Sequence, residues 1–487
     1  MKPIRVLFVN AVNPYVEAQN RYPALGLGYL VAALKEQFGD RVELMLIEDA
    51  IEESIRDWRP DLLAISSVSQ NYKVAMAYAE LGREAGIPVV VGGYHITELP
   101  GSLTPDMNVG VIGEGERAIC DLVELCLEHG SLPMAQLEGV EGIVFWRDGE
   151  CALTPPREVV GRQTKSLDEL PMPDRSMMRV RPHSNMLTSR GCPYNCTFCA
   201  STRFWPNIRY FSPEYMIEEV RYLRDNFGVR YITFHDDLFI ANVKRLEEFH
   251  ELVLREGLPE QGFRFSCASS ATRITDDMAR MLKEMNFVSV SMGLESGNQE
   301  VLARLKGRSF KVETNEQAVH TLHRHGIHPH ASFIIGEPGE TLEQMQETYD
   351  FIRRNPLSLV NIYVLTPLPG TPVWHAAMDK GLVSDDMDWD LLNISFELDW
   401  QRVILVSDTV SRDELHRMYQ KLRRLRLVKY AKAVASHPFQ MDLIEYGRAK
   451  AVEWAYRVKS AVSHGSGPIN TGLKKVSQPT SRSAGGS

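Results

Sequence analysis

The amino-acid sequence predicts an α/β protein: a doubly wound, Rossmann-like domain, then a partial (β/α)6 barrel of the TIM type, then a helical C-terminal segment. Two observations carry this prediction. Short apolar runs alternate with helical patterns over residues 1–130, and six further strand–helix units follow after residue 183. Continuous apolar strands separated by helices indicate parallel sheets that are covered on both faces.

The pattern divides the chain into five segments. We expect a front domain over residues 1–140, a hairpin and linker over 141–182, the barrel over 183–380, a helical cap over 381–463 and a disordered tail over 464–487. The tail is rich in glycine, serine and proline, a composition that buries too little apolar surface to fold.

Five strands are expected in the front domain, each an apolar run rich in β-branched residues: 4–9, 42–47, 62–65, 89–91 and 109–112. Helical periodicity lies between them, as over 27–38 and over 74–86, where a glycine and a proline end the helix. Residues 142–156 then predict a β-hairpin around Asp148 and Gly149. The stretch 166–182 is rich in proline and charge, which is typical of a linker.

Six strands are expected in the barrel, at 186–189, 231–234, 263–268, 288–292, 330–335 and 360–365. The helices expected between them span 213–226, 243–256, 275–285, 314–325 and 341–355. Six consecutive units predict a barrel that is shorter than the closed eight-unit form. Beyond residue 381 the pattern becomes irregular and then helical over 412–463.

The composition is that of a soluble globular protein, with 44% hydrophobic and 24% charged residues. The net charge of −9 gives no basic footprint, so we do not expect nucleic acid as a main partner. No apolar run is long enough to span a bilayer, and the N-terminal segment MKPIRVLFVN lacks a signal-peptide cleavage site. We therefore expect a cytoplasmic protein.

Three of the seven cysteines lie within eight positions, in the segment TSRGCPYNCTFCAS. Cys192, Cys196 and Cys199 form C-x3-C-x2-C directly after the first barrel strand, where the loops of such barrels carry the chemistry. Three thiolates from one loop can hold three irons of a [4Fe–4S] cluster and leave the fourth iron open. The alternative is a redox or zinc loop. Zinc needs a fourth ligand, and the nearest candidate, His183, lies at the far end of the preceding strand.

With Phe198 before the last cysteine, residues 185–375 closely resemble the radical S-adenosylmethionine (radical SAM) superfamily. The resemblance implies that the amino and carboxylate groups of SAM chelate the open iron. It implies that one electron from the cluster cleaves SAM to methionine and a 5′-deoxyadenosyl radical. An external electron donor of the flavodoxin or ferredoxin type is implied as well. In such enzymes the cofactors do the chemistry, and the protein supplies orientation and excludes water.

The resemblance also implies SAM contacts at the ends of later barrel strands. In FHDDLF, Asp236 or Asp237 faces the SAM ammonium, with Asp236 preferred. The alternative is a purely structural role as the N-cap of the next helix. Arg273, just past the third strand, either pairs with the SAM carboxylate or lies on the surface.

Two further segments resemble SAM-binding loops of the family. MGLESG supplies Glu295 and Ser296 as ribose contacts. SFIIGEPGET matches the family's G-x-P-G-E-T loop and brings Gly336 and Glu340 to SAM, because glycine lets the backbone approach a ligand closely.

The strand ends SSVSQNY, VGGYHIT and VIGEGE of the front domain resemble the cobalamin-binding domain that precedes the barrel in a large class of radical SAM enzymes. The resemblance implies that small residues make room for the cobalamin tail, and it assigns Ser66, Gly92, Gly93, Gly113, Glu114 and Gly115 to cobalamin. The alternative is a domain that has kept the fold and lost the cofactor.

Two ligand motifs are missing from the front domain. No G-x-G-x-x-G follows the first strand, which disfavours a dinucleotide. No D-x-H-x-x-G supplies a histidine to cobalt, so the resemblance implies base-off cobalamin without a histidine below it; the spacing of His95 does not fit that role.

With both cofactors, the resemblance implies a cobalamin-dependent methyltransferase that methylates an unactivated carbon or a phosphinate of a small-molecule substrate. The alternative is a radical SAM cyclase, dehydratase or oxidase of tetrapyrrole or antibiotic biosynthesis, in which the front domain transfers no methyl group. A secondary metabolite, a lipid or a tetrapyrrole each fit the resemblance as substrate.

Overall fold

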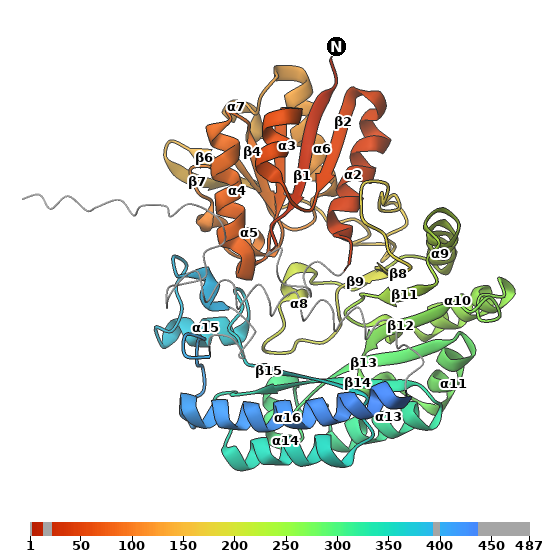
Figure 1. The fold of residues 1–487 in the computed structure, drawn as a ribbon. Coiled ribbons are helices and arrows are strands. Elements are labelled where there is room, and N and C mark those ends of the chain that lie inside the picture. The colour runs from red at the N-terminus through yellow and green to blue at the C-terminus, as the bar shows by residue number, and fades with distance from the viewer. Residues whose placement is uncertain (1, 13–21, 393–399, 437–487) are drawn as a thin grey trace, which may run out of the picture.

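The computed structural model describes residues 2–12, 22–392 and 400–436. The predicted tail and the last part of the predicted cap, residues 437–463, lie outside this range. In Figure 1 the front domain stands above the barrel, and the short elements α8 (Ser201–Phe204) and β9 (Ser189–Arg190) lie between the two.

The front domain is built on a seven-stranded sheet in the order β2-β1-β3-β4-β5-β6-β7. The first five strands are parallel: β1 (Ile4–Asn10), β2 (Val42–Ile47), β3 (Leu62–Ser66), β4 (Val89–Gly92) and β5 (Val109–Val111). The predicted hairpin, β6 (Ile143–Arg147) and β7 (Glu150–Leu153), continues the sheet in antiparallel pairing. Its turn residues Asp148 and Gly149 both have positive φ, as a two-residue hairpin turn requires.

Helices cover both faces of this sheet, as the doubly wound prediction requires. On one face α2 (Leu25–Phe38) and α6 (Glu116–His129) share a core with the strand residues Val6, Phe8 and Val90. On the other face α3 (Ile51–Trp58) and α4 (Tyr72–Glu84) pack on the alternate strand residues. The strand order reverses between β1 and β3, so the carboxyl ends of these strands form the crevice in which such sheets bind ligands.

The barrel is a single parallel sheet of six strands in the order β15-β14-β13-β12-β11-β8, open between its edge strands. From one edge to the other the strands are β8 (His183–Met186), β11 (Tyr231–Phe234), β12 (Arg264–Ser269), β13 (Phe287–Glu295), β14 (His328–Ile335) and β15 (Leu359–Val364). The helices on its outer face are α9 (Pro213–Phe227), α10 (Val243–Arg255), α11 (Asp276–Glu284), α13 (Val312–Arg324) and α14 (Leu342–Arg354). Helix α12 (Gln299–Lys306) instead contributes Val301 and Leu305 to the core that the barrel shares with the front domain.

Side-chain caps start several of these helices where the sequence changes character. Ser212 accepts from the backbone N–H of Tyr215 with Pro213 in the first turn, and Thr341 and Gln344 form a capping box. The prediction was wrong for the first barrel strand, which ends at Met186 and not at residue 189. Residues 189–190 form the separate strand β9 instead, because they pair in antiparallel fashion with β10 (Arg209–Tyr210).

The C-terminal part closes the open edge of the barrel. Helix α16 (Arg412–Ser436) lies against β15 and α14, and its residues Leu415, Met418 and Leu422 belong to the barrel core. An exposed edge strand invites pairing with other chains, and a covering helix prevents this. The described part of the predicted cap is therefore an integral part of the barrel.

A second core joins the two domains. Tyr72 and Ile96 of the front domain share one apolar cluster with Ile334 of β14, Trp374 of α15 (Pro372–Asp379) and Trp389 of the following turn. The rings of Trp374 and Trp389 stack at 6.2 Å. Trp374 is thus a packing residue of the domain interface, and this apolar contact holds the two sheets in a fixed relation.

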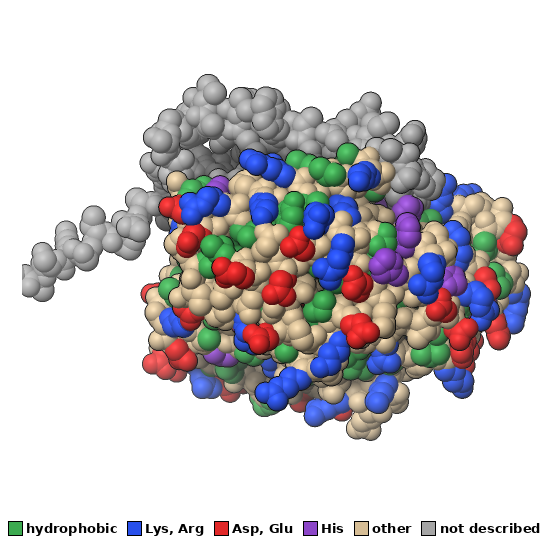
Figure 2. All heavy atoms as spheres, turned by 90° about the horizontal axis from the view of Figure 1, so that it is seen from below, with side chains coloured by type: hydrophobic (Ala, Val, Ile, Leu, Met, Phe, Trp, Pro, Cys, Tyr) green, Lys and Arg blue, Asp and Glu red, His purple; other side chains and the backbone are tan. Residues whose placement is uncertain are grey.

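The outer face of the barrel carries mixed charge. Seen from below, Lys and Arg side chains alternate with Asp and Glu (Figure 2). On the barrel helices, ion pairs join Arg324 to Asp276 at 3.0 Å and Arg354 to Glu316 at 2.9 Å. Mixed charges produce no single-sign field that would attract a polyanion. Within the described ranges, no helix has both the length and the apolarity needed to cross a membrane.

Candidate active site

The cysteine loop is pinned between the two domains. Gly191, which opens it, has φ +87°, and a side chain there would lie 2.7 Å from the carbonyl oxygen of Asn207. Within the loop, the backbone N–H of Thr197 donates to Leu305 at 2.9 Å, and Thr197 accepts from the N–H of Val373 at 3.3 Å. These bonds tie the loop to α12 and α15, so its cysteines are held by the barrel itself.

The three cysteines form a donor set that suits an iron–sulfur cluster. Cys196 is buried, and Cys192 and Cys199 are half-buried. No three His, Cys, Asp or Glu side chains converge on one point in the described part of the chain. Each thiolate of a cubane cluster binds its own iron, and the three thiols lie close enough for their charges to act on one another. The one histidine considered as a fourth ligand, His183, lies 2.8 Å from Thr233 Oγ1 in the sheet.

A buried lysine that sequence reasoning missed lies beneath this loop. Lys306, at the end of α12, donates to the carbonyl oxygen of Gly293 at 2.7 Å and lies 3.9 Å from Glu295 Oε1. Burial raises the pKa of the Cys196 thiol to about 12, and the Lys306 ammonium opposes that rise. No local sequence signal marks Lys306, because its position follows from the packing of α12 under the loop.

The two neighbouring aspartates have different surroundings. Asp236 is buried, and its carboxylate accepts from the Thr188 backbone N–H at 2.6 Å, the Thr188 hydroxyl and the Ser189 hydroxyl at 2.7 Å. Asp237 is exposed, receives a hydrogen bond from Ser201, and its charge acts on Cys192 and Cys199. This geometry does not support the preference for Asp236 as the ammonium partner. Asp236 anchors the root of the cysteine loop, and Asp237 is the aspartate left open beside it.

The MGLESG segment separates its two polar residues. Glu295 is buried at the end of β13 with φ +60°, and burial raises its pKa to about 7 while Lys306 opposes the rise. A left-handed backbone at a non-glycine residue is strained, and such strain is characteristic of functional sites. Ser296 instead lies 3.1 Å from Thr348 Oγ1 and accepts from the Asn298 N–H, so its hydroxyl is used in packing.

The Gly336 loop is stabilised by its own glutamate. Gly336 has φ +84°, and its N–H donates to Glu340 Oε2 at 2.7 Å. Glu340 is completely buried, its other carboxylate oxygen has no hydrogen-bond partner among the described residues, and burial raises its pKa to about 7. Arg273 is half-buried, and its Nε likewise lacks a partner within the described chain. An orphaned guanidinium N–H near the strand ends fits an anionic ligand group.

The carboxyl edge of the front sheet leaves room at one glycine and none at the next. Ser66 and Gly92 end β3 and β4 side by side, and a side chain at Gly92 would meet only Val111 at 3.8 Å. Gly93 has φ +103°, and a side chain there would lie 2.4 Å from the carbonyl oxygen of Ser67. Gly92 therefore fits a cradle for a ligand, whereas Gly93 permits the close approach of two strand-end loops.

The loop 113–115, at the end of β5, meets the barrel. Nothing lies within 4 Å of a side chain placed at Gly113, and Gly115 packs on Leu30. Both carboxylate oxygens of Glu114 are bonded by arginines of the barrel, Arg190 and Arg209. The Glu114 side chain is therefore committed to the domain interface, and only the loop backbone is open to a ligand.

His95 is a neutral core residue. It is completely buried and stacks on Tyr72 at 3.7 Å, and its Nδ1 lies 3.0 Å from Ser69 Oγ. Burial lowers its pKa to about 3, so the ring is neutral at physiological pH. His95 is enclosed in the interface core, and its spacing in the sequence also does not match that of a cobalt ligand.

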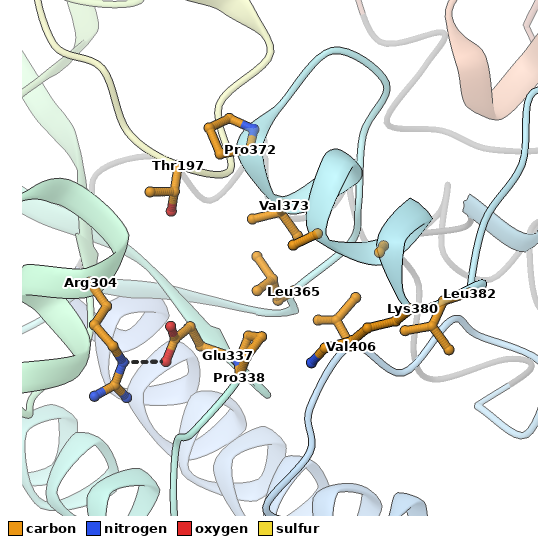
Figure 3. Close-up of a pocket in the computed structure, with 12 residues that line it drawn as sticks. Thr197, Arg304, Glu337, Pro338, Leu365, Pro372, Val373, Lys380, Leu382 and Val406 are labelled. Atoms are coloured by element: carbon orange, nitrogen blue, oxygen red, sulfur yellow. Dashed lines mark hydrogen bonds and ion pairs between the residues drawn. The ribbon is translucent and has the colours of Figure 1, made fainter.

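A small cavity of about 210 Å³ borders the cysteine loop at Thr197. In Figure 3 Arg304 and Glu337 point toward each other on one side, joined at 2.7 Å, while Leu365 and Val373 line another side. The cavity is smaller than the roughly 300–1,000 Å³ of typical small-molecule sites. Its lining confirms that the segment after β15 packs beside the loop.

Two family matches cover the two domains. Residues 186–352 match the Radical SAM superfamily, and residues 15–123 match the B12 binding domain. The first range contains the cysteine loop and the carboxyl ends of β11 to β14. The second contains the strand ends at Ser66 and Gly92.

Similar proteins share most of the chain. It is 30% identical over 385 residues to an uncharacterized methyltransferase of Pyrococcus horikoshii, covering 75% of this chain and 81% of that protein. It is 27% identical over 419 residues to the anaerobic magnesium-protoporphyrin IX monomethyl ester cyclase of Cereibacter sphaeroides, covering 78% of this chain and 65% of the cyclase.

A solved structure shares the fold. The radical S-adenosylmethionine methyltransferase TsrM of Kitasatospora setae, with cobalamin and a [4Fe–4S] cluster bound, gives a TM-score of 0.64 at 18% identity, over 77% of this chain and 78% of that one. At this identity the likeness shows a common arrangement of the two domains.

We predict that Gly93→Ala destabilises the cofactor-free protein, because the new methyl group would overlap the Ser67 carbonyl. The expected loss is about 1–3 kcal/mol, seen as a thermal midpoint several degrees lower. Gly101→Ala is the matched control, since a methyl group there meets nothing within 4 Å. Equal midpoints for the two variants would show that Gly93 has no packing role.

We predict that Glu340→Gln flattens the pH dependence of stability. Burial raises the folded pKa of Glu340 to about 7, above its ordinary 4.5, so its protonated form is favoured by folding. Between pH 5 and 8 the free energy of unfolding of the wild type should fall by up to about 3 kcal/mol relative to the variant. The stabilisation from protonated Glu340 disappears as the pH rises through 7. Denaturant unfolding of the cofactor-free proteins measures it. Glu295 titrates in both proteins, so its effect cancels in the difference between them. Parallel curves of unfolding free energy against pH would therefore contradict the role given to Glu340.

Proposed function

This chain belongs to the radical SAM superfamily and carries a B12-binding domain, and from that premise we propose that it is a cobalamin-dependent methyltransferase of a polar small molecule. It is an enzyme whose cofactors are a [4Fe–4S] cluster, SAM and cobalamin. One observation carries the proposal: the open edge of the front sheet and the cysteine loop meet at one interface, joined by Glu114 and Arg190. Methyl transfer needs both cofactor sites to reach one substrate.

We assign the cofactors to residues as follows. Cys192, Cys196 and Cys199 hold three irons, and the edge formed by Ser66, Gly92 and the loop 113–115 receives cobalamin. When bound, the cluster supplies the electron that cleaves SAM, and cobalamin supplies the methyl group. A flavodoxin- or ferredoxin-type protein is the proposed electron donor. The seven free cysteines suit a reducing compartment, which we propose is the cytoplasm.

SAM is proposed to lie between the loop and the ends of β12 to β14. Lys306 and the orphaned Nε of Arg273 are the cationic groups positioned for its carboxylate, and Asp237 is the open carboxylate for its ammonium. Glu295 is proposed to accept from the ribose, and the Gly336 loop, held by Glu340, presents backbone to the remainder. Charge-assisted bonds of this kind fix orientation as well as affinity.

A polar inner face supports a polar substrate. Along β11 to β15 one set of alternate residues packs under the helices, so the other set faces the hollow of the barrel. That inner set includes Thr233 and Ser266, whose hydroxyls lie 2.8 Å apart, Ser291 beside His330, and Ser332 beside Asn361. Hydroxyl, amide and imidazole groups suit a ligand rich in hydrogen-bonding groups.

A second candidate is a radical cyclase, dehydratase or oxidase, because a cyclase of magnesium-protoporphyrin ester is among the similar proteins. In that case the front domain would bind cobalamin without donating its methyl group to a product. The two candidates differ in the fate of the SAM methyl carbon.

The function is tested with SAM carrying a CD3 group, a chemical reductant and a metabolite extract of the native cell as the source of the methyl acceptor, under anaerobic conditions. We expect 5′-deoxyadenosine and transfer of the CD3 group, and Cys196→Ala should bring both to background because it removes one iron ligand. 5′-Deoxyadenosine without labelled product, in the presence of bound cobalamin, would favour the second candidate. A Cys196→Ala enzyme that still forms 5′-deoxyadenosine would overturn the cluster assignment.

The substrate class is tested with the same labelled SAM and a metabolite extract of the native cell, divided into water-soluble and chloroform-soluble fractions. The polar inner face predicts the CD3 label in the water-soluble fraction. Ser332→Val, which replaces a half-buried inner hydroxyl by two methyl groups, should raise the KM for the labelled compound. Label in the chloroform fraction would contradict the polar class while leaving methyl transfer intact.

A further inference from the structure

We propose that Glu114 is a positioning residue that fixes the cobalamin edge of the front domain relative to the cysteine loop of the barrel. The proposal rests on the proposed function, since it assumes that these two loops hold the two cofactors. Its evidence is a buried charge network that spans the domain interface.

The network consists of two glutamates from the front domain and two arginines from the barrel. Glu114 Oε1 accepts from Arg190 at 2.7 Å and from Arg209 at 2.8 Å, while Glu114 Oε2 accepts from Arg209 at 2.9 Å. Arg190 also donates to Glu116 at 2.5 Å. All four side chains are at most 8% exposed. The opposite charges therefore lie together in a space that is almost closed to bulk solvent.

The arginines need a partner from the other domain. Strands β9 and β10 pair Arg190 directly opposite Arg209. Like charges on opposite residues of an antiparallel pair repel each other, and burial removes the water that would screen them. Glu114 bridges both guanidinium groups, so the β9–β10 ribbon keeps its shape only while the loop 113–115 is docked on it. The barrel supplies none of the four bonds that these two guanidinium groups make to carboxylates.

The β9–β10 ribbon connects the Glu114 contact to the cysteines that are proposed to bind the cluster. Arg190 lies two residues before Cys192, and the intervening Gly191 is confined by the Asn207 and Trp205 carbonyls. On the barrel side, Asp236 holds residues 188 and 189. Residues 188–190, which precede the cysteine loop, are thus bonded from both domains. Glu114 supplies a bond from the front domain.

This role differs from holding the domains together. The apolar core around Tyr72, Trp374 and Trp389 joins the domains independently of the charge network. Buried ion pairs contribute little net stability but penalise wrong geometry strongly, because a displaced charge is left unpaired. Loss of the Glu114 charge should therefore release the loop while the two domains stay associated.

The first test uses hydrogen exchange on the cofactor-free protein. Glu114→Gln removes one charge at constant shape, and the matched control is Glu219→Gln, because Glu219 pairs with Arg175 at 2.5 Å in a completely buried site and makes no hydrogen bond to either loop in the described chain. Losing a charge-assisted bond of about 1.5–3 kcal/mol corresponds to roughly 10- to 100-fold faster exchange. We expect that increase in peptides covering residues 188–199 for Glu114→Gln alone. Unchanged protection there, or an equal increase in Glu219→Gln, would overturn the proposal.

The second test measures position directly. Pulsed EPR on protein loaded with reduced cluster and cob(II)alamin gives the distribution of cluster–cobalt distances. We expect a narrow distribution for wild type and Glu219→Gln, and a broader or shifted one for Glu114→Gln. The same distribution in all three would refute the positioning role. Failure of the proposed function itself would show differently, as wild-type protein without a cobalamin absorption band, and the exchange experiment would still decide what Glu114 does.

Discussion

The short segment 188–190 has to satisfy both domains at once, and the rest of the site depends on that constraint. Asp236 binds it from the barrel, Glu114 and Glu116 bind it from the front domain, and the three cysteines follow directly after it. A loop held from one side only would have its thiolates fixed relative to one domain. A loop held from both sides ties the cluster to the edge where cobalamin is proposed to bind, and so makes the domain interface part of the active site.

Around this segment, buried charge is used in two ways. Both carboxylate oxygens of Glu114 are paired with arginines, which specifies geometry, although the Nε atoms of Arg190 and Arg209 have no partner in the described chain. Other buried groups are incomplete: Arg273 Nε and one oxygen of Glu340 lack partners there, and burial raises the pKa of Glu295 to about 7. Incomplete buried polar groups cost stability, and such groups are characteristic of ligand sites, where a bound molecule supplies the missing bonds. Their position at the strand ends is consistent with the SAM site that we propose.

Local patterns predicted most of the fold, and non-local pairing accounts for the main error. The strand at 231–234 was predicted with its observed bounds, because apolar alternation and flanking helices are visible within the segment. The first barrel strand was misplaced, since residues 189–190 belong to β9 only through pairing with β10, some twenty residues later in the chain. The hairpin was predicted, but its attachment to β5 required knowledge of a neighbour in space.

The site divides in the same way. The cysteine triad is a local spacing and was found directly, and its family is confirmed by the match over 186–352. The choice between Asp236 and Asp237 depends on Thr188, which is 48 residues away from Asp236, and no local pattern contains it. Glu114 was assigned to cobalamin through the resemblance of the strand end VIGEGE, yet its carboxylate is bonded by Arg190, 76 residues later. Lys306 carries no motif, and only the packing of α12 reveals it.

The central claim is that one chain holds both cofactors at one interface, and the most direct measurement is their stoichiometry. Protein purified anaerobically with cobalamin supplied should contain four irons, four sulfides and one cobalamin per chain in the same sample. A cluster without cobalamin would contradict the claim, because the front domain would then be a fold that has lost its cofactor, and the methyl group would have no carrier.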